Sequence, residues 1–263
     1  EVDTFWVSKT RRSSVGASVG SSVGSSVGSS VGSSVGSSAG SSVGSSVGSS
    51  VGSSEGKFSI DGKEYQLVLN TGDGKHHLHG GNDGFANQLW CGEINDNGNV
   101  EFTYFSEDGE CGYPGELLAK AEYHWSDDNE LTLTLRAETN EATVVNLTNH
   151  VYFNLKGEGN GNILDHNLKI YAQNYLPATE ELITTGEIAT VKETPMDFTE
   201  TKLIGRDIKA DFPALVNGKG YDSCWVLDNY NKGVMKQAAT LSSDASGIKV
   251  GFVAILCFLF HNE

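Results

Sequence analysis

The sequence predicts an all-β fold of antiparallel strands, arranged as a sandwich or as a large twisted pair of sheets. Apolar and polar residues alternate with a period of two through several segments between residues 57 and 172. A two-residue turn signal between two such segments indicates hairpin connections. No window of ten or more residues shows the apolar spacing of an amphipathic helix, so we expect little helix.

The N-terminal segment, residues 1–56, is dominated by a short repeat. Residues 1–12 have no clear assignment, and from residue 13 to residue 56 the unit Ser-Ser-Val-Gly recurs in 11 in-phase tetrads, 44 residues in all. Such a segment has too little apolar surface to offset the entropy of ordering it. We therefore expect residues 1–56 to be disordered, or to be an artefact of a repetitive stretch of gene.

The first predicted strands form a hairpin at residues 57–67. Residues 57–60 and 63–67 are strand-like, and Asp61 and Gly62 lie between them. Asp-Gly supplies the two positive φ angles that a tight type I′ turn needs. A two-residue hairpin loop is therefore predicted at Asp61 and Gly62.

The longer predicted strands follow from period-two alternation, which indicates one buried and one wet face. Val100, Phe102 and Tyr104 alternate with polar residues. Residues 142–149 and 168–172 read as further strands. Two faces are especially regular, and a turn at residues 127–129 separates them: Leu117, Ala119, Ala121, Tyr123 and Trp125, then Leu131, Leu133, Leu135 and Ala137.

The charge excludes several classes of partner. Lys and Arg total 18 and Asp and Glu total 34, a formal charge of −16. Residues 1–56 are neutral overall, so the whole excess falls on residues 57–263, which are enough chain for one domain. A strongly acidic domain without a basic run is a poor partner for nucleic acid or for an anionic membrane surface.

The compartment and membrane signals agree with one another. The longest apolar run, residues 250–260, has 11 residues, whereas a bilayer span takes roughly 20. The N-terminus has no signal-peptide pattern. The four cysteines are widely spaced and form no CxxC pair, which favours a reduced compartment. We expect a cytoplasmic protein that does not cross a membrane.

Two clusters of residues carry chemistry. The first is His76-His77-Leu78-His79-Gly80-Gly81, which closes a Gly-rich loop, and the second is the segment 149–154, Asn-His-Val-Tyr-Phe-Asn, at the end of a predicted strand. Histidine is the side chain whose ordinary pKa suits proton transfer near neutral pH. The rings of Tyr152 and Phe153 offer flat apolar faces that suit the C–H face of a sugar.

Other interpretations of the polar residues were weighed against catalysis. His77 and His79, two apart on a predicted strand, would point to one side and could bind a metal, but no third ligand is placed by spacing. A histidine at a strand end is more often a structural residue, and His124 and His166 read as exposed and structural, respectively. The acidic loop at residues 107–110 reads as a solvated surface.

Several longer motifs occur in one order along the chain, and together they resemble the aldose 1-epimerase (galactose mutarotase) family. The resemblance runs from about residue 56 to about residue 250. The matching segments are 77–81 with Gly84, Phe85 and Trp90, then 106–115, 145–155, 163–166, 175–177, 185–188 and 220–222. Several long motifs in register are far more specific than one short pattern.

The resemblance implies an antiparallel β-supersandwich and an isomerase that needs neither cofactor nor metal. Such enzymes interconvert the α and β anomers of aldohexoses such as galactose and glucose by opening and closing the sugar ring. His150 would be the general acid, and His79 would hold and polarise the sugar. Asp222 would bind sugar hydroxyls, and we add Tyr152 to the expected substrate-binding residues beside His79 and His150.

The sequence also departs from the family. The segment before residue 57 lacks the family's sugar-binding Arg, and Asp222 is followed by Ser223 and Cys224 instead of His-Asn. The resemblance fades near residue 250, before the late strand that carries the family's general-base Glu. We therefore expect a truncated domain at residues 57–250, followed at 251–263 by an apolar tail that arises from read-through or mis-splicing.

Two alternative functions follow from these departures. One is a non-catalytic sugar-binding protein that keeps His79, His150 and Asp222 but lacks the base and the Arg. The other is an epimerase of hexose 6-phosphates, which needs cationic groups. The two arginines after residue 57, Arg136 and Arg206, and the acidic charge argue against it. Sugar preference and oligomeric state are not predicted.

Overall fold

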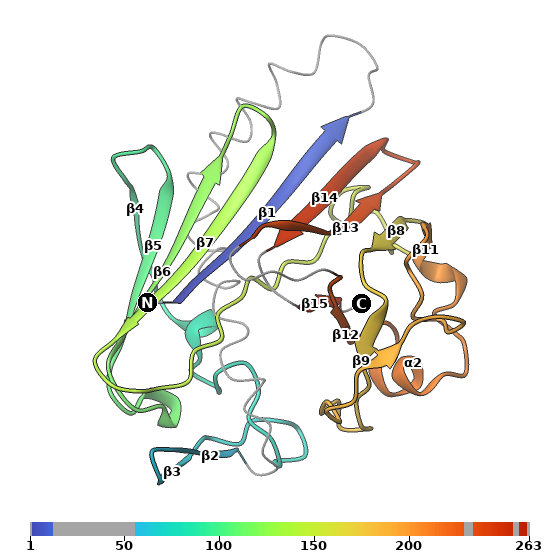
Figure 1. Ribbon diagram of the computed structural model, residues 1–263. Coiled ribbons are helices and arrows are strands. Elements are labelled where there is room, and N and C mark those ends of the chain that lie inside the picture. The colour runs from blue at the N-terminus through green and yellow to red at the C-terminus, as the bar shows by residue number, and fades with distance from the viewer. Residues whose placement is uncertain (1, 13–55, 229–233, 255–257, 262–263) are drawn as a thin grey trace. The chain divides into compact units, whose positions relative to one another are not determined.

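The computed structural model describes residues 2–12, 56–228, 234–254 and 258–261. They form two compact units (Figure 1). The described residues of the first unit are 2–4, 56–124 and 133–152, and those of the second are 5–12, 125–132, 153–228, 234–254 and 258–261. The Ser-Ser-Val-Gly repeat lies outside the described residues up to residue 55.

An antiparallel sheet in the order β7-β6-β5-β4 forms the main body of the first unit (Figure 1). Its inner face is confirmed by burial, because Ala119 and Ala121 on β6 and Leu133 and Leu135 on β7 are almost fully buried. The turn that the sequence predicts at 127–129 is also present, with Asn129 at φ 60°. The strands are β4 (Cys91–Ile94), β5 (Val100–Ser106), β6 (Leu117–Trp125) and β7 (Glu130–Thr139).

The predicted hairpin is present as β2 (Lys57–Ile60) and β3 (Lys63–Gln66), which pair antiparallel. Asp61 and Gly62 have φ angles of 51° and 80°, the two positive values that the type I′ prediction requires. Two short 3₁₀ turns complete the first unit, η1 (Phe85–Asn87) and η2 (Glu110–Gly112).

The second unit holds two antiparallel sheets. One has the order β11-β8-β13-β14-β1, and the other has the order β10-β9-β12-β15. The bounds are β1 (Val2–Arg12), β8 (Asn167–Ile170), β9 (Asn174–Leu176), β10 (Ala189–Thr190), β11 (Lys202–Leu203), β12 (Ser223–Val226), β13 (Lys236–Ser242), β14 (Ile248–Ala254) and β15 (Phe258–His261). A 3₁₀ turn η3 (Ile204–Arg206) and the six-residue helix α2 (Pro213–Gly218) connect them.

The core of the second unit is built around a group of aromatic side chains. Trp225, Tyr221 and Phe198 are fully buried, and Phe198 meets both other rings edge-on, at 4.9 Å from Tyr221 and 6.1 Å from Trp225. Edge-to-face pairs of this kind add to the free energy that burial of the rings already provides. The indole nitrogen of Trp225 donates to the carbonyl oxygen of Met196 at 3.1 Å, so the ring is satisfied as well as buried.

Two segments differ from the sequence-based expectations. Residues 142–149, predicted as a strand, have no strand assignment, because their β-branched side chains favour extended backbone but no described strand pairs with them. Residues 2–12, left without an assignment, form β1, which pairs with β14 so that Trp6 lies opposite Ala254. The backbone hydrogen bonds to a distant strand, β14, make residues 2–12 a strand that the local sequence did not indicate.

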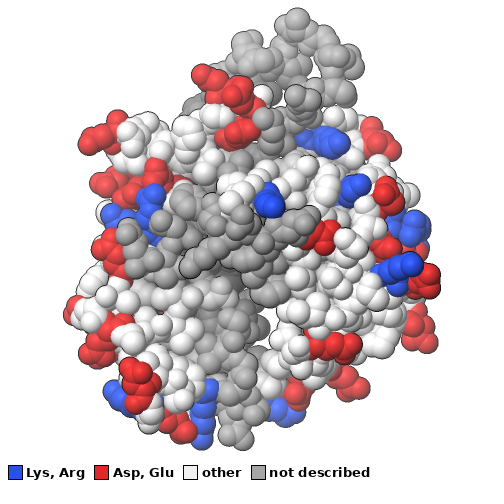
Figure 2. Space-filling model, viewed as in Figure 1, with Lys and Arg blue, Asp and Glu red and all other residues white. Residues whose placement is uncertain are grey.

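The fold prediction as a whole is confirmed. The strand pairs whose register the structure describes are antiparallel, and α2 is the single α-helix among the described residues. The expected domain boundaries at residues 57 and 250 stay a prediction, and β14 runs across the second. No described helix has the length and apolar character to cross a membrane. On the face drawn in Figure 2, acidic side chains are spread widely and no continuous area is basic.

We expect Gly112→Ala to destabilise the chain more than Gly109→Ala. Both glycines have positive φ angles, 91° and 85°. A Cβ at Gly112 would lie 2.6 Å from the carbonyl oxygen of Gln66, whereas a Cβ at Gly109 would meet nothing within 4 Å. The shared backbone strain costs roughly 1 kcal/mol or more, and the clash should add about 1–3 kcal/mol for Gly112 alone. Urea denaturation of both variants measures the difference, and equal midpoints would contradict it.

Candidate functional site

Two histidines from distant parts of the chain meet in the first unit. The rings of His79 and His150 lie 5.7 Å apart between centroids and are nearly perpendicular, at 88°. His79 belongs to the Gly-rich loop and His150 to the extended segment after β7. Both side chains are half-buried. The structure thus brings together the two residues that the sequence predicts as catalytic.

A side-chain amide shapes the loop that carries His79. The Nδ2 of Asn70 donates to the carbonyl oxygen of Leu78 at 2.8 Å, and its Oδ1 accepts from the Leu78 N–H at 2.7 Å. The backbone N–H of Asn70 also donates to the carbonyl oxygen of His76 at 3.0 Å. These bonds pair the chain on either side of the Gly-rich turn without a regular strand, and they fix the backbone immediately before His79.

The backbone at His79 itself adopts a left-handed conformation with φ of 54°, which is uncommon for a residue other than glycine. The chain then passes back over it, so that a Cβ at Gly84 would lie only 2.6 Å from the His79 carbonyl oxygen. Glycine is therefore required at position 84 for a steric reason, although its own φ is ordinary. The Gly-rich sequence allows a tight turn that directs one imidazole toward His150.

His77 anchors this loop through two hydrogen bonds. Its Nδ1–H donates to the carbonyl oxygen of Val68 at 2.6 Å, and its Nε2 accepts from the hydroxyl of Tyr113 at 2.9 Å. Burial lowers the pKa of His77, and the Val68 bond acts in the opposite direction. Both ring nitrogens are therefore occupied. Sequence analysis did not recognise this positioning role, although Tyr113 belongs to one of the matching motifs.

The metal alternative for His77 and His79 loses its geometric basis. It assumed a strand in which residues two apart point to one side. Residues 76–81 are not a strand, because the turn places His79 in the left-handed region. Both ring nitrogens of His77 are also hydrogen-bonded, one to Val68 and the other to Tyr113. The strand assignment at these residues was wrong, and its cause is the turn that the following glycines allow.

The environment of His79 favours its neutral form. Burial lowers the pKa of His79, and the nearby His150 lowers it further because two positive imidazoles repel each other. Its Nδ1 is buried and has no hydrogen-bond partner in the described structure. A neutral imidazole with an unused nitrogen can bond to a hydroxyl group of a ligand.

Tyr152 also contacts His150. Its ring stacks on the imidazole at 5.0 Å with 29° between the planes, and the side chain is 65% exposed. It can offer a flat apolar face, as the sequence suggests. Phe153 cannot serve in the same way, because its ring packs against Phe252 at 5.2 Å and joins the core of the second unit.

Asp222 belongs to the second unit, immediately before β12. It is half-buried, and its backbone N–H donates to the carbonyl oxygen of Gly220 at 3.1 Å in a tight turn. The structure therefore groups His79, His150 and Tyr152 in one unit and places Asp222 in the other.

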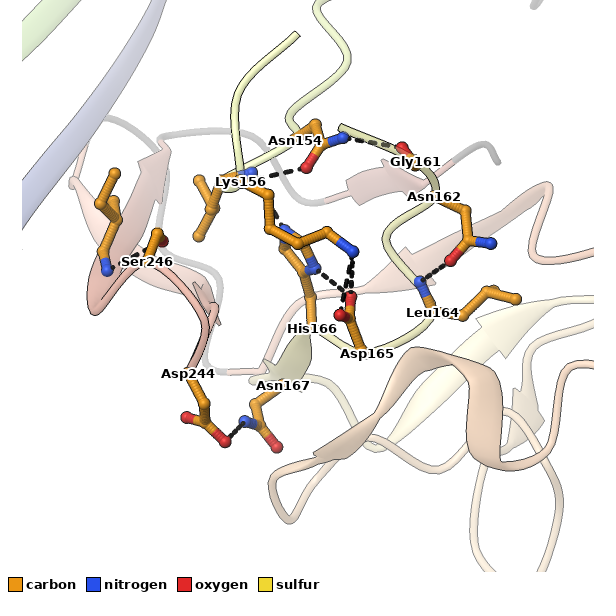
Figure 3. Close-up of polar contacts among 12 residues, drawn as sticks. Asn154, Lys156, Gly161, Asn162, Leu164, Asp165, His166, Asn167, Asp244 and Ser246 are labelled. Atoms are coloured by element: carbon orange, nitrogen blue, oxygen red, sulfur yellow. Dashed lines mark hydrogen bonds and ion pairs between the residues drawn. The ribbon is translucent and has the colours of Figure 1, made fainter. Parts of the chain in front are cut away.

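His166 is structural, as the sequence suggests. It is fully buried, its Nε2 accepts from the backbone N–H of Leu155 at 3.0 Å, and its Nδ1–H donates to Asp165 at 3.1 Å (Figure 3). Lys156 binds the same carboxylate at 2.8 Å and lowers the pKa of Asp165. With both nitrogens engaged, His166 ties the segment that follows the 149–154 motif to the sheet.

In the acidic loop, Glu107 and Asp108 are exposed, as expected for a solvated surface, whereas Glu110 is half-buried. Asp108 accepts from the backbone N–H of Gly115 at 2.7 Å, and Glu110 accepts from the hydroxyl of Tyr104 at 2.9 Å. Burial, followed by this bond to Glu110, raises the pKa of Tyr104. Glu110 is half-buried, so these carboxylates hold the loop together. His124 is exposed, as expected, and hydrogen-bonds Asn99.

Comparison with known proteins identifies the family. The profile described as aldose 1-epimerase matches residues 28–253, most of the chain. The chain belongs to the aldose 1-epimerase family. The resemblance inferred from the sequence motifs is thereby confirmed.

Relatives and solved structures of this family agree with the match. Galactose mutarotase of Bos taurus is 45% identical over 170 residues, which cover 65% of this chain and 48% of that protein. Aldose 1-epimerase of Escherichia coli K12 is 35% identical over 188 residues, which cover 72% of this chain and 53% of that protein. The chain thus spans about half the length of the curated relatives it matches.

The solved structure of galactose 1-epimerase from Lactobacillus acidophilus NCFM aligns with a TM-score of 0.65 and 32% identity. The alignment covers 77% of this chain and 57% of that one. The expected galactose mutarotase-like, antiparallel β fold is confirmed by this likeness to a solved aldose 1-epimerase family structure.

We expect His150→Gln to raise the pKa of His79, because the substitution removes a neighbouring imidazole that can carry positive charge. Burial remains, so the pKa should stay below 6.5. A proton NMR titration of the histidine rings measures both values, and His124→Gln, which changes an exposed ring in the same unit, is the control. An unchanged His79 titration in the His150 variant would show that the two rings are not electrostatically coupled.

Proposed function

We propose that this site belongs to an aldose 1-epimerase that interconverts the α and β anomers of aldohexoses such as galactose and glucose. The observation that carries the proposal is the contact between His79 and His150, 5.7 Å between ring centroids, in a chain of this family. Because the chain spans about half the length of its curated relatives, the proposal concerns the complete active site to which these residues contribute.

The proposed reaction consists of proton transfers and one ring opening. A base takes the proton from the anomeric hydroxyl, and the freed electron pair forms the aldehyde C=O. The bond from C1 to the ring oxygen breaks, and the ring oxygen takes a proton from protonated His150. Rotation about C1–C2 and the reverse steps close the ring on the other face and restore both groups. These steps need no redox or group-transfer cofactor.

The chain's own residues fit distinct parts of this reaction. His150 can donate the proton because its imidazole is partly exposed and lies beside His79. His79, whose pKa is lowered by burial, stays neutral and would hydrogen-bond a sugar hydroxyl through its imidazole ring. Tyr152 would contact the apolar face of the sugar ring, and the carboxylate of Asp222 would accept hydrogen bonds from its hydroxyls.

The neutral state of His79 matters for this division of roles. If both rings were protonated, their repulsion would disfavour the charged acid that the ring oxygen needs. A neutral His79 avoids this conflict. We also propose an aldohexose as the small-molecule partner and the cytosol as the compartment. The free thiols of Cys91, Cys111 and Cys224 support a reduced environment.

We expect His150→Gln to lower the enzyme-catalysed mutarotation rate by about 10²–10⁴-fold, the usual contribution of a positioned acid. The measurement is polarimetry on freshly dissolved α-D-galactose. His124→Gln is the control, because His124 is exposed and should leave the rate unchanged. A His150 variant as active as the wild-type chain would contradict its role as the acid.

The same measurements separate catalysis from binding alone. Mutarotation no faster than in buffer, together with measurable galactose binding by isothermal titration, would favour the non-catalytic sugar-binding protein. Competition between galactose and glucose 6-phosphate tests the alternative of a hexose 6-phosphate epimerase. Under that alternative, glucose 6-phosphate should bind more tightly than galactose. Loss of binding in His79→Ala, with the fold intact, is expected under either sugar-binding function.

A further inference from the structure

The second unit contains a buried lysine whose charge has a specific set of contacts. The side chain of Lys202 is 2% exposed. Its ammonium donates to the carbonyl oxygen of Pro195 at 2.6 Å and to Oδ2 of Asp207 at 2.7 Å. It also lies 4.2 Å from the centroid of the Phe198 ring. A carbonyl, a carboxylate and an aromatic face therefore surround one charge.

Two of these contacts lead directly to Tyr221. The carbonyl oxygen of Pro195, which binds Lys202, also accepts from the hydroxyl of Tyr221 at 3.0 Å. The ring of Phe198, which lies under the ammonium, meets the ring of Tyr221 edge-on at 4.9 Å. The Tyr221 side chain is fully buried. Lys202 thus contacts both the Pro195 carbonyl and the Phe198 ring, the two groups that also contact the Tyr221 side chain.

Tyr221 in turn is the residue before Asp222, the proposed sugar-binding carboxylate. The backbone leading to it is fixed by a bond from the Gly220 N–H to the carbonyl oxygen of Leu215 at 3.0 Å. On the other side, β12 is held by the Trp225 indole, which donates to Met196 O at 3.1 Å. Asp222 therefore lies between Tyr221 and Trp225 in the sequence. Both aromatic side chains donate a hydrogen bond to a backbone carbonyl of the segment 195–198.

We propose that Lys202 is a positioning residue for the sugar site, which acts through Pro195, Phe198 and Tyr221 to hold the carboxylate of Asp222 in place. The inference rests on the proposed function, in which Asp222 binds sugar hydroxyls. It assigns Lys202 no contact with the sugar.

Burying the ammonium of Lys202 costs free energy of folding, which argues for a role beyond packing. Burial lowers the pKa of Lys202, and Asp207 acts in the opposite direction. Replacing a buried ion pair by apolar residues of similar volume is often neutral or stabilising, so stability alone does not call for a lysine here. An ammonium can bind the Pro195 carbonyl and the Phe198 face together, which an apolar side chain cannot.

The first test is Lys202→Met, which keeps an unbranched side chain one heavy atom shorter and removes its charge. Asp207 stays paired, because Arg206 binds the same oxygen through Nε and NH2, both at 3.0 Å. We expect the variant to fold, with the near-ultraviolet circular dichroism of buried Trp225 retained. The dissociation constant for galactose should rise by about tenfold, and kcat should change little because the acid His150 is untouched.

Lys169→Met is the matched control. Lys169 also lies over an aromatic ring in the second unit, 5.4 Å from the centroid of Tyr171, but its ion pair is with the exposed Glu200 at 3.9 Å. The same substitution there should leave galactose binding unchanged. If Lys169→Met weakened binding as much as Lys202→Met, the effect would be one of general charge and the inference would be overturned.

Chemical rescue separates positioning from mere packing. Lys202→Ala removes three methylene groups and the ammonium, which together correspond to propylammonium. Millimolar propylamine should restore galactose binding, and 1-propanol, which fills the same space without the charge, should not. Equal rescue by both compounds would mean that Lys202 acts by volume alone, which would overturn the inference.

Asp222→Ala makes the two levels of the argument distinguishable. Under the proposed function it weakens galactose binding strongly. If it does not, or if the wild-type chain binds no galactose, the proposed sugar site fails and the positioning role falls with it. If Asp222→Ala weakens binding but Lys202→Met matches the wild type, the sugar site stands and the Lys202 inference alone is wrong.

Discussion

The left-handed backbone conformation of His79 is the constraint on which the candidate site depends. A positive φ at a histidine is held only by its surroundings. Here the surroundings are the Asn70 amide, the turn past Gly84, and the His77 ring between Val68 and Tyr113. Without this turn the loop would continue as extended chain, and the imidazole would have no fixed direction toward His150. The chemistry proposed for the site follows from that direction.

The histidines show that one residue type has several physical roles in a single chain. His77 and His166 each use both ring nitrogens in hydrogen bonds to backbone, hydroxyl or carboxylate groups, and both tie loops to neighbouring structure. His79 keeps one buried nitrogen without a partner. His77 and His166 thus have both ring nitrogens satisfied within the protein, whereas His79 does not.

Local chemistry explains which parts could be predicted from the sequence. The Asp61–Gly62 turn and the alternating faces of β6 and β7 depend on near neighbours, so they were predicted correctly. Family motifs suggested roles for His79 and His150, and the structure places their rings 5.7 Å apart, while the roles themselves stay a prediction. The strand at residues 2–12 depends on a distant partner, and the extended segment at 142–149 has no partner among the described strands. Neither outcome could be predicted from the local sequence. The half-burial of Glu110 likewise goes with a tertiary contact, the hydrogen bond from the hydroxyl of Tyr104.

The Asn70 amide has a consequence for how narrowly the loop is specified. The side chain must donate to one Leu78 group and accept from the other at the same time. An aspartate has the same shape, but ionised it can only accept, and its second oxygen would face the Leu78 carbonyl oxygen. Conversion of this one amide to an acid, by mutation or by slow deamidation as the protein ages, would replace an attraction with a repulsion. The His79 loop would then keep its conformation only for as long as the Asn70 side-chain amide stays intact.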